Sequence, residues 1–173
     1  MSKLTIDNCQ YTFSKLASNV LPNHMKRMRR AIASSYPMDI FGTKGSGPKS
    51  ILQRLDRSED FAGCYVLLEN TDPFYVGISR SVVQRLSQHV KGRTHYDASL
   101  AYKIACENQN HGLKRDAAMK DRVFKEKFRK AQAYLKSLNV AFIEINNDLE
   151  LYLFEVYCAM KLNTSKWNTF RTH

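Results

Sequence analysis

The stretch GCYVLLENTDPFYVGIS, residues 63–79, decides the fold because it contains two short β-prone runs separated by turn-forming residues. Tyr65 lies in the first run and Tyr75 in the second, each among aliphatic neighbours. Residues 70–73 read Asn-Thr-Asp-Pro, and all four residue types favour turns. The stretch therefore predicts a β-hairpin with one tyrosine in each strand.

A helix is expected directly after the hairpin. Ser79 is a suitable N-cap, and Arg85 and His89 lie four residues apart on one face of the expected helix. A different face is apolar, with these residues at helical spacing: Val82, Val83, Leu86 and Val90.

Three further elements are expected downstream, after a short helix over about 98–107. Residues 114–138 predict one long basic helix, with Val123, Phe128 and Leu135 among its buried positions. Residues 140–145 alternate as a third strand, and a last helix begins at Asn147 or Asp148.

The N-terminal part predicts helices and loops. Residues 10–36 indicate one or two helices, divided by a turn at residues 21–23. Residues 41–50 contain three glycines and a proline, which is typical of a flexible loop, and residues 51–60 indicate a short helix.

The expected fold class is α/β (α+β), with a small antiparallel or mixed three-stranded sheet flanked by helices. We interpret residues 1–60 as a helical N-terminal arm and residues 61–173 as the main domain. Within that domain, a basic helical insertion is expected at about 96–138.

The composition is that of a soluble globular protein. The chain has 173 residues, of which 43% are hydrophobic and 25% charged, and it contains no apolar run long enough to cross a membrane. Because the first residues lack the apolar stretch of a secretory signal, a cytoplasmic location is expected. Cys64 and Cys158 lie within apolar runs, which favours small core residues over disulfide or zinc partners.

The net charge of +11 is concentrated in two segments. Residues 1–60 hold ten Lys/Arg against five Asp/Glu, and residues 114–139 hold nine against three. This distribution favours a polyanionic partner such as nucleic acid over two merely solvated helix faces.

Several residues then combine into a known pattern. Gly63-Cys64-Tyr65 and Tyr75-Val76-Gly77 resemble the two halves of the signature of the GIY-YIG nuclease superfamily. Cys64 and Val76 replace the isoleucines of that signature, and both substitutions keep an apolar residue inside a strand. The roughly 65-residue separation of His89 from Glu155 is longer than in the minimal family domain, which is why an insertion is expected.

The resemblance extends to the polar residues that follow the hairpin. Arg85 matches the essential arginine of the family, and His89 matches a histidine found one helical turn later in one subgroup. The run ending at Glu155 is similar to the family's metal-binding segment. Asn168, after the tryptophan at residue 167, matches an asparagine that follows an aromatic residue.

The resemblance implies a chemical role for each residue. Glu155 with water would hold Mg²⁺ (or Mn²⁺), and Arg85 would contact the phosphate. Tyr65 would be the general base, with His89 as the rival because histidine titrates near neutrality. Tyr75 would position water or phosphate, while two residues would form the edge of the site: Gly77 and Asn168.

The implied function is metal-dependent endonucleolytic cleavage of DNA, in a restriction, repair or mobile-element role. RNA is not excluded as a substrate, and a restriction-type enzyme would act as a homodimer. The alternative is a catalytically inactive nucleic-acid-binding module with the same fold.

Other polar residues are candidates for weaker roles. Glu144 and Glu150 are lesser candidates for a second acid, and three histidines are interpreted as surface residues: His24, His95 and His111. The residues expected to contact DNA phosphates are Arg80, Lys91, Arg93, Lys26, Arg27, Arg29, Arg30, Lys120 and Arg122.

Overall fold

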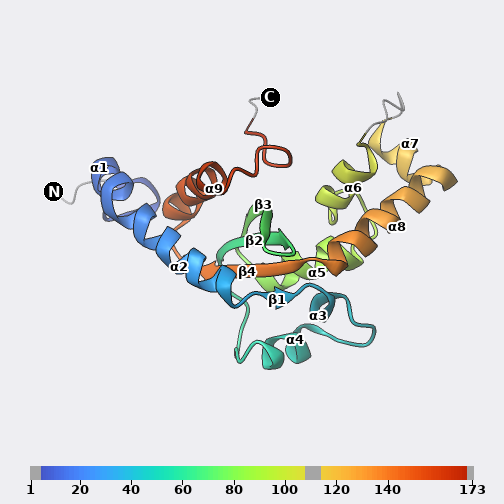
Figure 1. Ribbon diagram of the computed structural model, residues 1–173, viewed down its shortest axis with the longest axis horizontal. Coiled ribbons are helices and arrows are strands. Elements are labelled where there is room, and N and C mark those ends of the chain that lie inside the picture. The colour runs from blue at the N-terminus through green and yellow to red at the C-terminus, as the bar shows by residue number, and fades with distance from the viewer. Residues whose placement is uncertain (1–4, 108–113, 171–173) are drawn as a thin grey trace. The chain divides into compact units, whose positions relative to one another are not determined.

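The computed structural model describes residues 5–107 and 114–170 and shows an α+β protein (Figure 1). Its sheet has the strand order β1-β4-β2-β3. The strands are β1 (Tyr36–Pro37), β2 (Gly63–Glu69), β3 (Asp72–Ser79) and β4 (Asn139–Glu144). The expected three strands are confirmed, and the two-residue β1 adds a fourth.

The described chain forms two compact units. The first, here called the sheet unit, comprises residues 5–36, 61–82 and 139–170, and the second, the helical unit, comprises residues 37–60, 83–107 and 114–138. The helical turns of the sheet unit are η1 (Ile6–Asn8), α1 (Phe13–Lys15), η2 (Leu16–Val20), α2 (Leu21–Ala33) and α9 (Asp148–Leu162). Those of the helical unit are α3 (Asp39–Gly42), α4 (Pro48–Arg54), α5 (Val82–Lys91, from Val83 onward), α6 (Ser99–Ala105), α7 (Arg115–Lys120) and α8 (Arg122–Ser137).

The predicted hairpin is confirmed, with a tighter turn than expected. β2 and β3 pair antiparallel, and Glu69 opposite Asp72 leaves only residues 70 and 71 in the loop. Asn70 has a φ of 58°, a left-handed conformation that asparagine tolerates better than most residues. The register shifts between Leu67 and Leu68, and this β-bulge changes the pairing immediately beside Tyr75.

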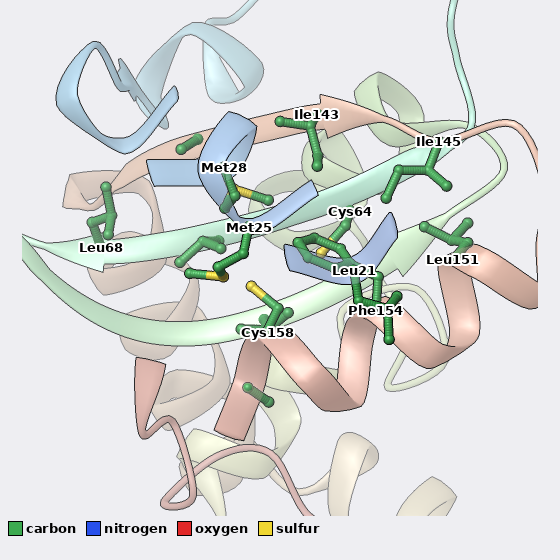
Figure 2. Close-up of a cluster of buried hydrophobic side chains, with 14 residues drawn as sticks. Leu21, Met25, Met28, Cys64, Leu68, Ile143, Ile145, Leu151, Phe154 and Cys158 are labelled. Atoms are coloured by element: carbon green, nitrogen blue, oxygen red, sulfur yellow. The ribbon is translucent and has the colours of Figure 1, made fainter. Parts of the chain in front are cut away.

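The core of the sheet unit lies on one face of the sheet, under α2 and α9. Because side chains alternate along a strand, Cys64, Val66 and Leu68 of β2 share this face, and Tyr65 lies on the other. Figure 2 shows how residues from α2, β2, β4 and α9 converge in this cluster. The prediction that the two cysteines at 64 and 158 are core residues is confirmed, since both are fully buried.

The N-terminal helices differ from expectation in one respect. The predicted turn at residues 21–23 is wrong, because the chain stays helical through the π-helical turn η2 into α2. Pro22 lies near the start of α2, which directly follows this π-helical turn. Met25 and Met28 of α2 are buried in the core, so α2 forms a layer of the sheet unit. The domain boundary at residue 60 stays a prediction.

Helix starts in the helical unit also differ from expectation. The helix expected over 51–60 begins earlier, at Pro48. The Asp60 carboxylate, and not Ser79, caps α5, because its two oxygens accept hydrogen bonds from the backbone N–H groups of Val83 (2.8 Å) and Gln84 (3.0 Å). Sequence reasoning could not identify this cap because Asp60 lies more than 20 residues before the helix.

The long basic helix expected over 114–138 is divided in two. Asp121 has extended backbone dihedrals, and its side chain caps α8 by accepting a hydrogen bond from the Phe124 N–H group at 2.7 Å. Val123, expected to be buried, is 61% exposed, and Phe124 is buried instead, because residue 124 shares the helical period of the buried Phe128 and Leu135. Phe128 and Leu135 are buried as predicted.

The strand and helix expected near the C-terminus are confirmed. β4 places Ala141, Ile143 and the following Ile145 in the core cluster, and Asn147 caps α9 through the Glu150 N–H group at 3.1 Å. Among the described residues, no helix combines the length and apolar character that crossing a membrane would require.

Candidate active site

Tyr65 and Gly77 face each other across the hairpin, and the glycine makes room for the tyrosine ring. They are direct partners in the register of β2 and β3. A Cβ atom at residue 77 would overlap the Cζ and Oη atoms of Tyr65. Tyr65 is only 1% exposed, so its ring is held over the glycine backbone and has little space to move. The glycine is thus required by the aromatic residue opposite it.

Gly63, the first residue of the motif, has a different reason to be glycine. A Cβ atom there would overlap the backbone carbonyl oxygen of Ile143, on the neighbouring strand β4. Because backbone cannot move aside as a flexible side chain can, this position fixes the close approach of β2 to β4. Tyr65 follows two residues later on the same strand, so Gly63 helps to define where that tyrosine lies.

Tyr75 lies on the same sheet face as Tyr65, and Asn168 fixes the strand that bears it. The two tyrosine rings have centroids 6.3 Å apart. The Asn168 side chain accepts a hydrogen bond from the Val76 N–H group (2.9 Å) and donates one to the Val76 carbonyl oxygen (2.8 Å). Asn168 therefore pairs with the outer edge of β3 as another strand would, between Tyr75 and Gly77.

Glu155 lies on α9, which packs against the face of the sheet opposite the two tyrosines. Its side chain is half-buried, and burial raises the pKa of its carboxyl group. Glu155 also helps to raise the pKa of the Cys64 thiol, after desolvation and the contact of that thiol with Cys158, which indicates that the carboxylate is close to β2. Within residues 5–107 and 114–170, the Glu155 carboxylate makes no hydrogen bond and no ion pair.

Arg85, in the helical unit, is held by uncharged acceptors. Its Nη1 donates to the backbone carbonyl of Asp97 at 2.9 Å and, more weakly, to Gln88 Oε1 at 3.5 Å, and its Nη2 donates to Ser99 Oγ at 2.9 Å. In the described part of the chain no carboxylate forms an ion pair with it. The guanidinium is thus positioned while its charge remains uncompensated, which suits the binding of a phosphate.

His89, one turn after Arg85 on α5, is fully buried. Burial, with a further contribution from the positive charge of Arg85, lowers its pKa to about 3. The expectation that His89 titrates near neutrality is therefore wrong for this environment, because the imidazole stays neutral at pH 7. A base with so low a pKa accepts a proton from water less readily than an ordinary histidine does.

Of the residues expected to contact DNA, several already contact protein groups. Arg80 pairs with Asp148, and Arg27 donates to the backbone carbonyl of Glu144 at 2.8 Å. Lys91 donates to the Ser46 carbonyl at 3.0 Å. All nine members of the group are exposed. Their contacts with DNA stay predictions.

Two of the histidines interpreted as surface residues are not on the surface. His95 is 5% exposed and lies 3.5 Å from an oxygen of Asp116. His24 Nε2 lies 2.9 Å from an oxygen of Glu150, and the two side chains form an ion pair whenever the histidine is protonated. Glu150, a lesser candidate for a second acid, therefore already contacts a protein group. His111 is outside the described residues.

Comparison with protein families identifies the family of this chain. Residues 61–163 match the model of the GIY-YIG catalytic domain. The chain belongs to the GIY-YIG family. Neither the curated proteins nor the solved structures compared with the chain include a significant match. The match covers β2, β3, β4 and α9 and the polar residues at 65, 75, 85, 89 and 155.

Membership gives the coarse function of the protein. GIY-YIG domains are nuclease-type domains that act on DNA and generally use divalent metal ions. Within the described residues, no three His, Cys, Asp or Glu side chains form a metal-binding cluster. A single half-buried carboxylate such as Glu155 still fits Mg²⁺, because this ion keeps several waters and binds one or two protein carboxylates together with substrate phosphate.

The structure adds residues that sequence reasoning did not identify. Asp97 and Ser99 hold the Arg85 guanidinium, and Asp60 fixes the start of the helix that bears it. None of the three belongs to the family signature. The one available signal was the presence of polar side chains at Asp97 and Ser99, near the start of the helix expected from about residue 98.

Proposed function

We propose that this protein is a metal-dependent endonuclease that hydrolyses DNA phosphodiester bonds. The observation that most supports this proposal is the state of Glu155, in a chain of the GIY-YIG family. Its carboxylate is half-buried and has neither a hydrogen bond nor an ion pair among the described residues. Partial burial of an uncompensated carboxylate is costly, and a bound divalent cation would remove that cost.

Glu155 is the residue proposed to hold Mg²⁺ or Mn²⁺, with water as the other ligand. When bound, the ion would offset charge on the phosphoryl oxygens and assist departure of the 3′-oxygen. The raised pKa of Glu155 agrees with this role, because metal binding would favour the ionised form that burial disfavours.

The other proposed roles follow from the chemistry of each side chain. Arg85 binds the phosphate with planar, permanently charged donors. Tyr65 is the general base that accepts a proton from the attacking water, and Tyr75, which shares its face of the sheet, positions water or phosphate. His89 is neutral at pH 7 and is proposed to support Arg85 rather than to accept the proton.

Nicking of supercoiled plasmid DNA tests the enzymatic proposal directly. Incubation of the protein with plasmid and Mg²⁺ is expected to convert supercoiled DNA to the open-circular form, and EDTA is expected to prevent the conversion. Salt-sensitive DNA binding without any nicking, in Mg²⁺ and in Mn²⁺, would favour the alternative of an inactive binding module.

Substitution of Glu155 tests the metal site. Glu155→Ala is expected to abolish nicking and to leave DNA binding largely intact, because the carboxylate is assigned to the metal and not to affinity. Glu155→Gln keeps the size and removes the charge, so it should be equally inactive. Wild-type nicking by either variant would exclude Glu155 as the metal ligand.

A comparison of Tyr65→Phe with His89→Ala tests the assignment of the base. Tyr65→Phe keeps the ring that packs over Gly77 and removes only the hydroxyl, so we expect a large loss of cleavage with little loss of stability. Near-normal cleavage by Tyr65→Phe, together with a changed pH–rate profile in His89→Ala, would assign the base to His89 instead.

The biological role is proposed more broadly, as restriction, repair or mobile-element cleavage. A restriction-type enzyme that cuts both strands is expected to act as a homodimer, because one active site cuts one strand at a time. Digestion of linear, flap and branched DNAs, with RNA of the same sequence, would distinguish these roles by the substrate that is cut fastest.

A further inference from the structure

The helical unit contains a cavity of about 610 Å³ beside α5, large enough for a small organic ligand. One wall is a face of α5, a second is the segment from Ser46 to Ile51, and the third is the segment from Gly92 to Asp97. All of the lining residues belong to this one unit. None of them is assigned a role in catalysis.

The wall formed by α5 presents polar groups at helical spacing. Gln84, Ser87, Gln88 and Lys91 follow one another at intervals of three, one and three residues, which places them on one face of the helix. Other faces of α5 are used for packing, since Leu86 and its apolar neighbours are buried. Two amides, a hydroxyl and an ammonium group are therefore available to a ligand in the cavity.

The cavity also has a positive edge. The Lys91 ammonium donates one hydrogen bond, to the Ser46 carbonyl oxygen at 3.0 Å, and retains two further donors. Arg93 is exposed and makes neither a hydrogen bond nor an ion pair with any residue in 5–107 or 114–170. The carboxylate that lines the cavity, Asp97, accepts a hydrogen bond from Thr94 Oγ1 at 2.8 Å, so part of its acceptor capacity is occupied.

The opposite wall is apolar. Pro48 is exposed and provides aliphatic surface there, and Ile51 lines the cavity while itself almost fully buried. A ligand suited to this cavity would combine a flat apolar face, an edge of hydrogen-bond donors and acceptors, and an anionic group. A nucleotide has these three features, in its base face, its base edge and its phosphate.

Two of the lining residues also contact Arg85. Gln88 Oε1 lies 3.5 Å from Arg85 Nη1, and the Asp97 carbonyl oxygen accepts from the same nitrogen at 2.9 Å. A ligand in the cavity would therefore lie next to the guanidinium proposed to bind the cleaved phosphate.

We propose that this cavity binds a single unstacked nucleotide of the DNA substrate, adjacent to the phosphate that Arg85 contacts. The base packs on Pro48, and its edge is recognised by the Gln84 and Gln88 amides. Lys91 and Arg93 contact its phosphate. The position relative to the cleaved bond rests on the proposed nuclease function, whereas nucleotide binding itself does not.

This site would also define a class of substrate. A base can enter a cavity only after it leaves the stack, which costs a few kcal/mol in duplex DNA and least in single-stranded DNA. DNA with an unpaired nucleotide beside the cleaved bond, such as a flap or branch, is therefore the expected substrate in preference to a perfect duplex.

Mononucleotide binding tests the proposal without any cleavage. Calorimetric titration in EDTA would compare dAMP with deoxyribose 5-phosphate and inorganic phosphate as probes. We expect saturable dAMP binding at least about tenfold tighter than that of either base-free probe. Equal affinity for dAMP and inorganic phosphate would show a simple anion site and would overturn the proposal.

Variants of the cavity locate the binding. Gln84→Ala removes an exposed amide while keeping a strong helix former, and Lys91→Gln removes the charge while keeping a donor for the Ser46 carbonyl. Each is expected to weaken dAMP binding at least about fivefold. Arg54→Gln, which removes an exposed cation outside the cavity, is the matched control and should leave dAMP binding unchanged.

The outcomes distinguish this site from the proposed nuclease function. Unchanged dAMP affinity in both Gln84→Ala and Lys91→Gln would refute the nucleotide site, whatever the nicking result. Normal dAMP binding by a protein that cuts no DNA would refute only the nuclease proposal.

Discussion

The contact of Gly77 with Tyr65 leads to a prediction whose size can be worked out from the structure. In Gly77→Ala, the new methyl group would overlap the Cζ and Oη atoms of Tyr65. The ring is 1% exposed, so it cannot rotate into solvent without losing its packing. Overpacking of this kind costs about 1–3 kcal/mol, which for a chain of this length corresponds to a fall in Tm of about 2–12 °C.

A double-mutant cycle measured by urea denaturation would attribute this loss to the contact. Tyr65→Leu removes both overlapping ring atoms, so Gly77→Ala in that background should cost little or be neutral. Gly47→Ala is the control for a Cβ atom added without overlap, because a Cβ atom there meets no other atom within 4 Å, and its only expected cost is that of alanine at the N-cap of α4. The same loss from Gly77→Ala with tyrosine and with leucine at residue 65 would refute the explanation.

The two remaining predictions concern Asn168 and His89. Asn168→Ala removes both hydrogen bonds to Val76 and should cost about 1–3 kcal/mol. Asn168→Asp keeps an acceptor for the Val76 N–H group but sets a carboxylate oxygen against the Val76 carbonyl oxygen, so we expect it to destabilise the protein more than Asn168→Ala. Hydrogen exchange at the Val76 amide should accelerate in both variants. The pKa of His89 is about 3 in the folded protein and about 6.5 in the unfolded chain, so between these pH values only the unfolded state binds the proton. The free energy of unfolding should therefore fall by up to about 1.4 kcal/mol per pH unit as the pH decreases from 6.5 towards 3. His89→Gln should flatten this slope in urea denaturation measured between pH 4 and 6.5, and an unchanged slope would show that His89 is not the titrating group.

Local patterns in the sequence predicted the elements that depend on neighbouring residues. The alternation in residues 63–79 is enough to specify a hairpin, because apolar residues in short strands and turn formers between them act over a few positions. Asn147 was identified as a helix cap for the same reason, since its side chain bonds to an N–H group three residues later.

Interactions between distant residues were beyond such patterns. The Asp60 carboxylate caps α5 from more than 20 residues away, so no pattern of neighbouring residues could identify it. The break at Asp121 was missed although it is local, since its cap acts over only three residues.

For the candidate site, the sequence by itself determined the identity and order of the chemical groups, from Tyr65 to Glu155, and with them the family. The tertiary structure decided the position, the hydrogen-bond partners and the pKa of these groups. It set the Tyr65 ring over Gly77, paired Asn168 with the edge of β3, and lowered the pKa of His89 to about 3. Desolvation and close packing depend on every neighbour that surrounds a side chain in space, and most of those neighbours are remote in the sequence.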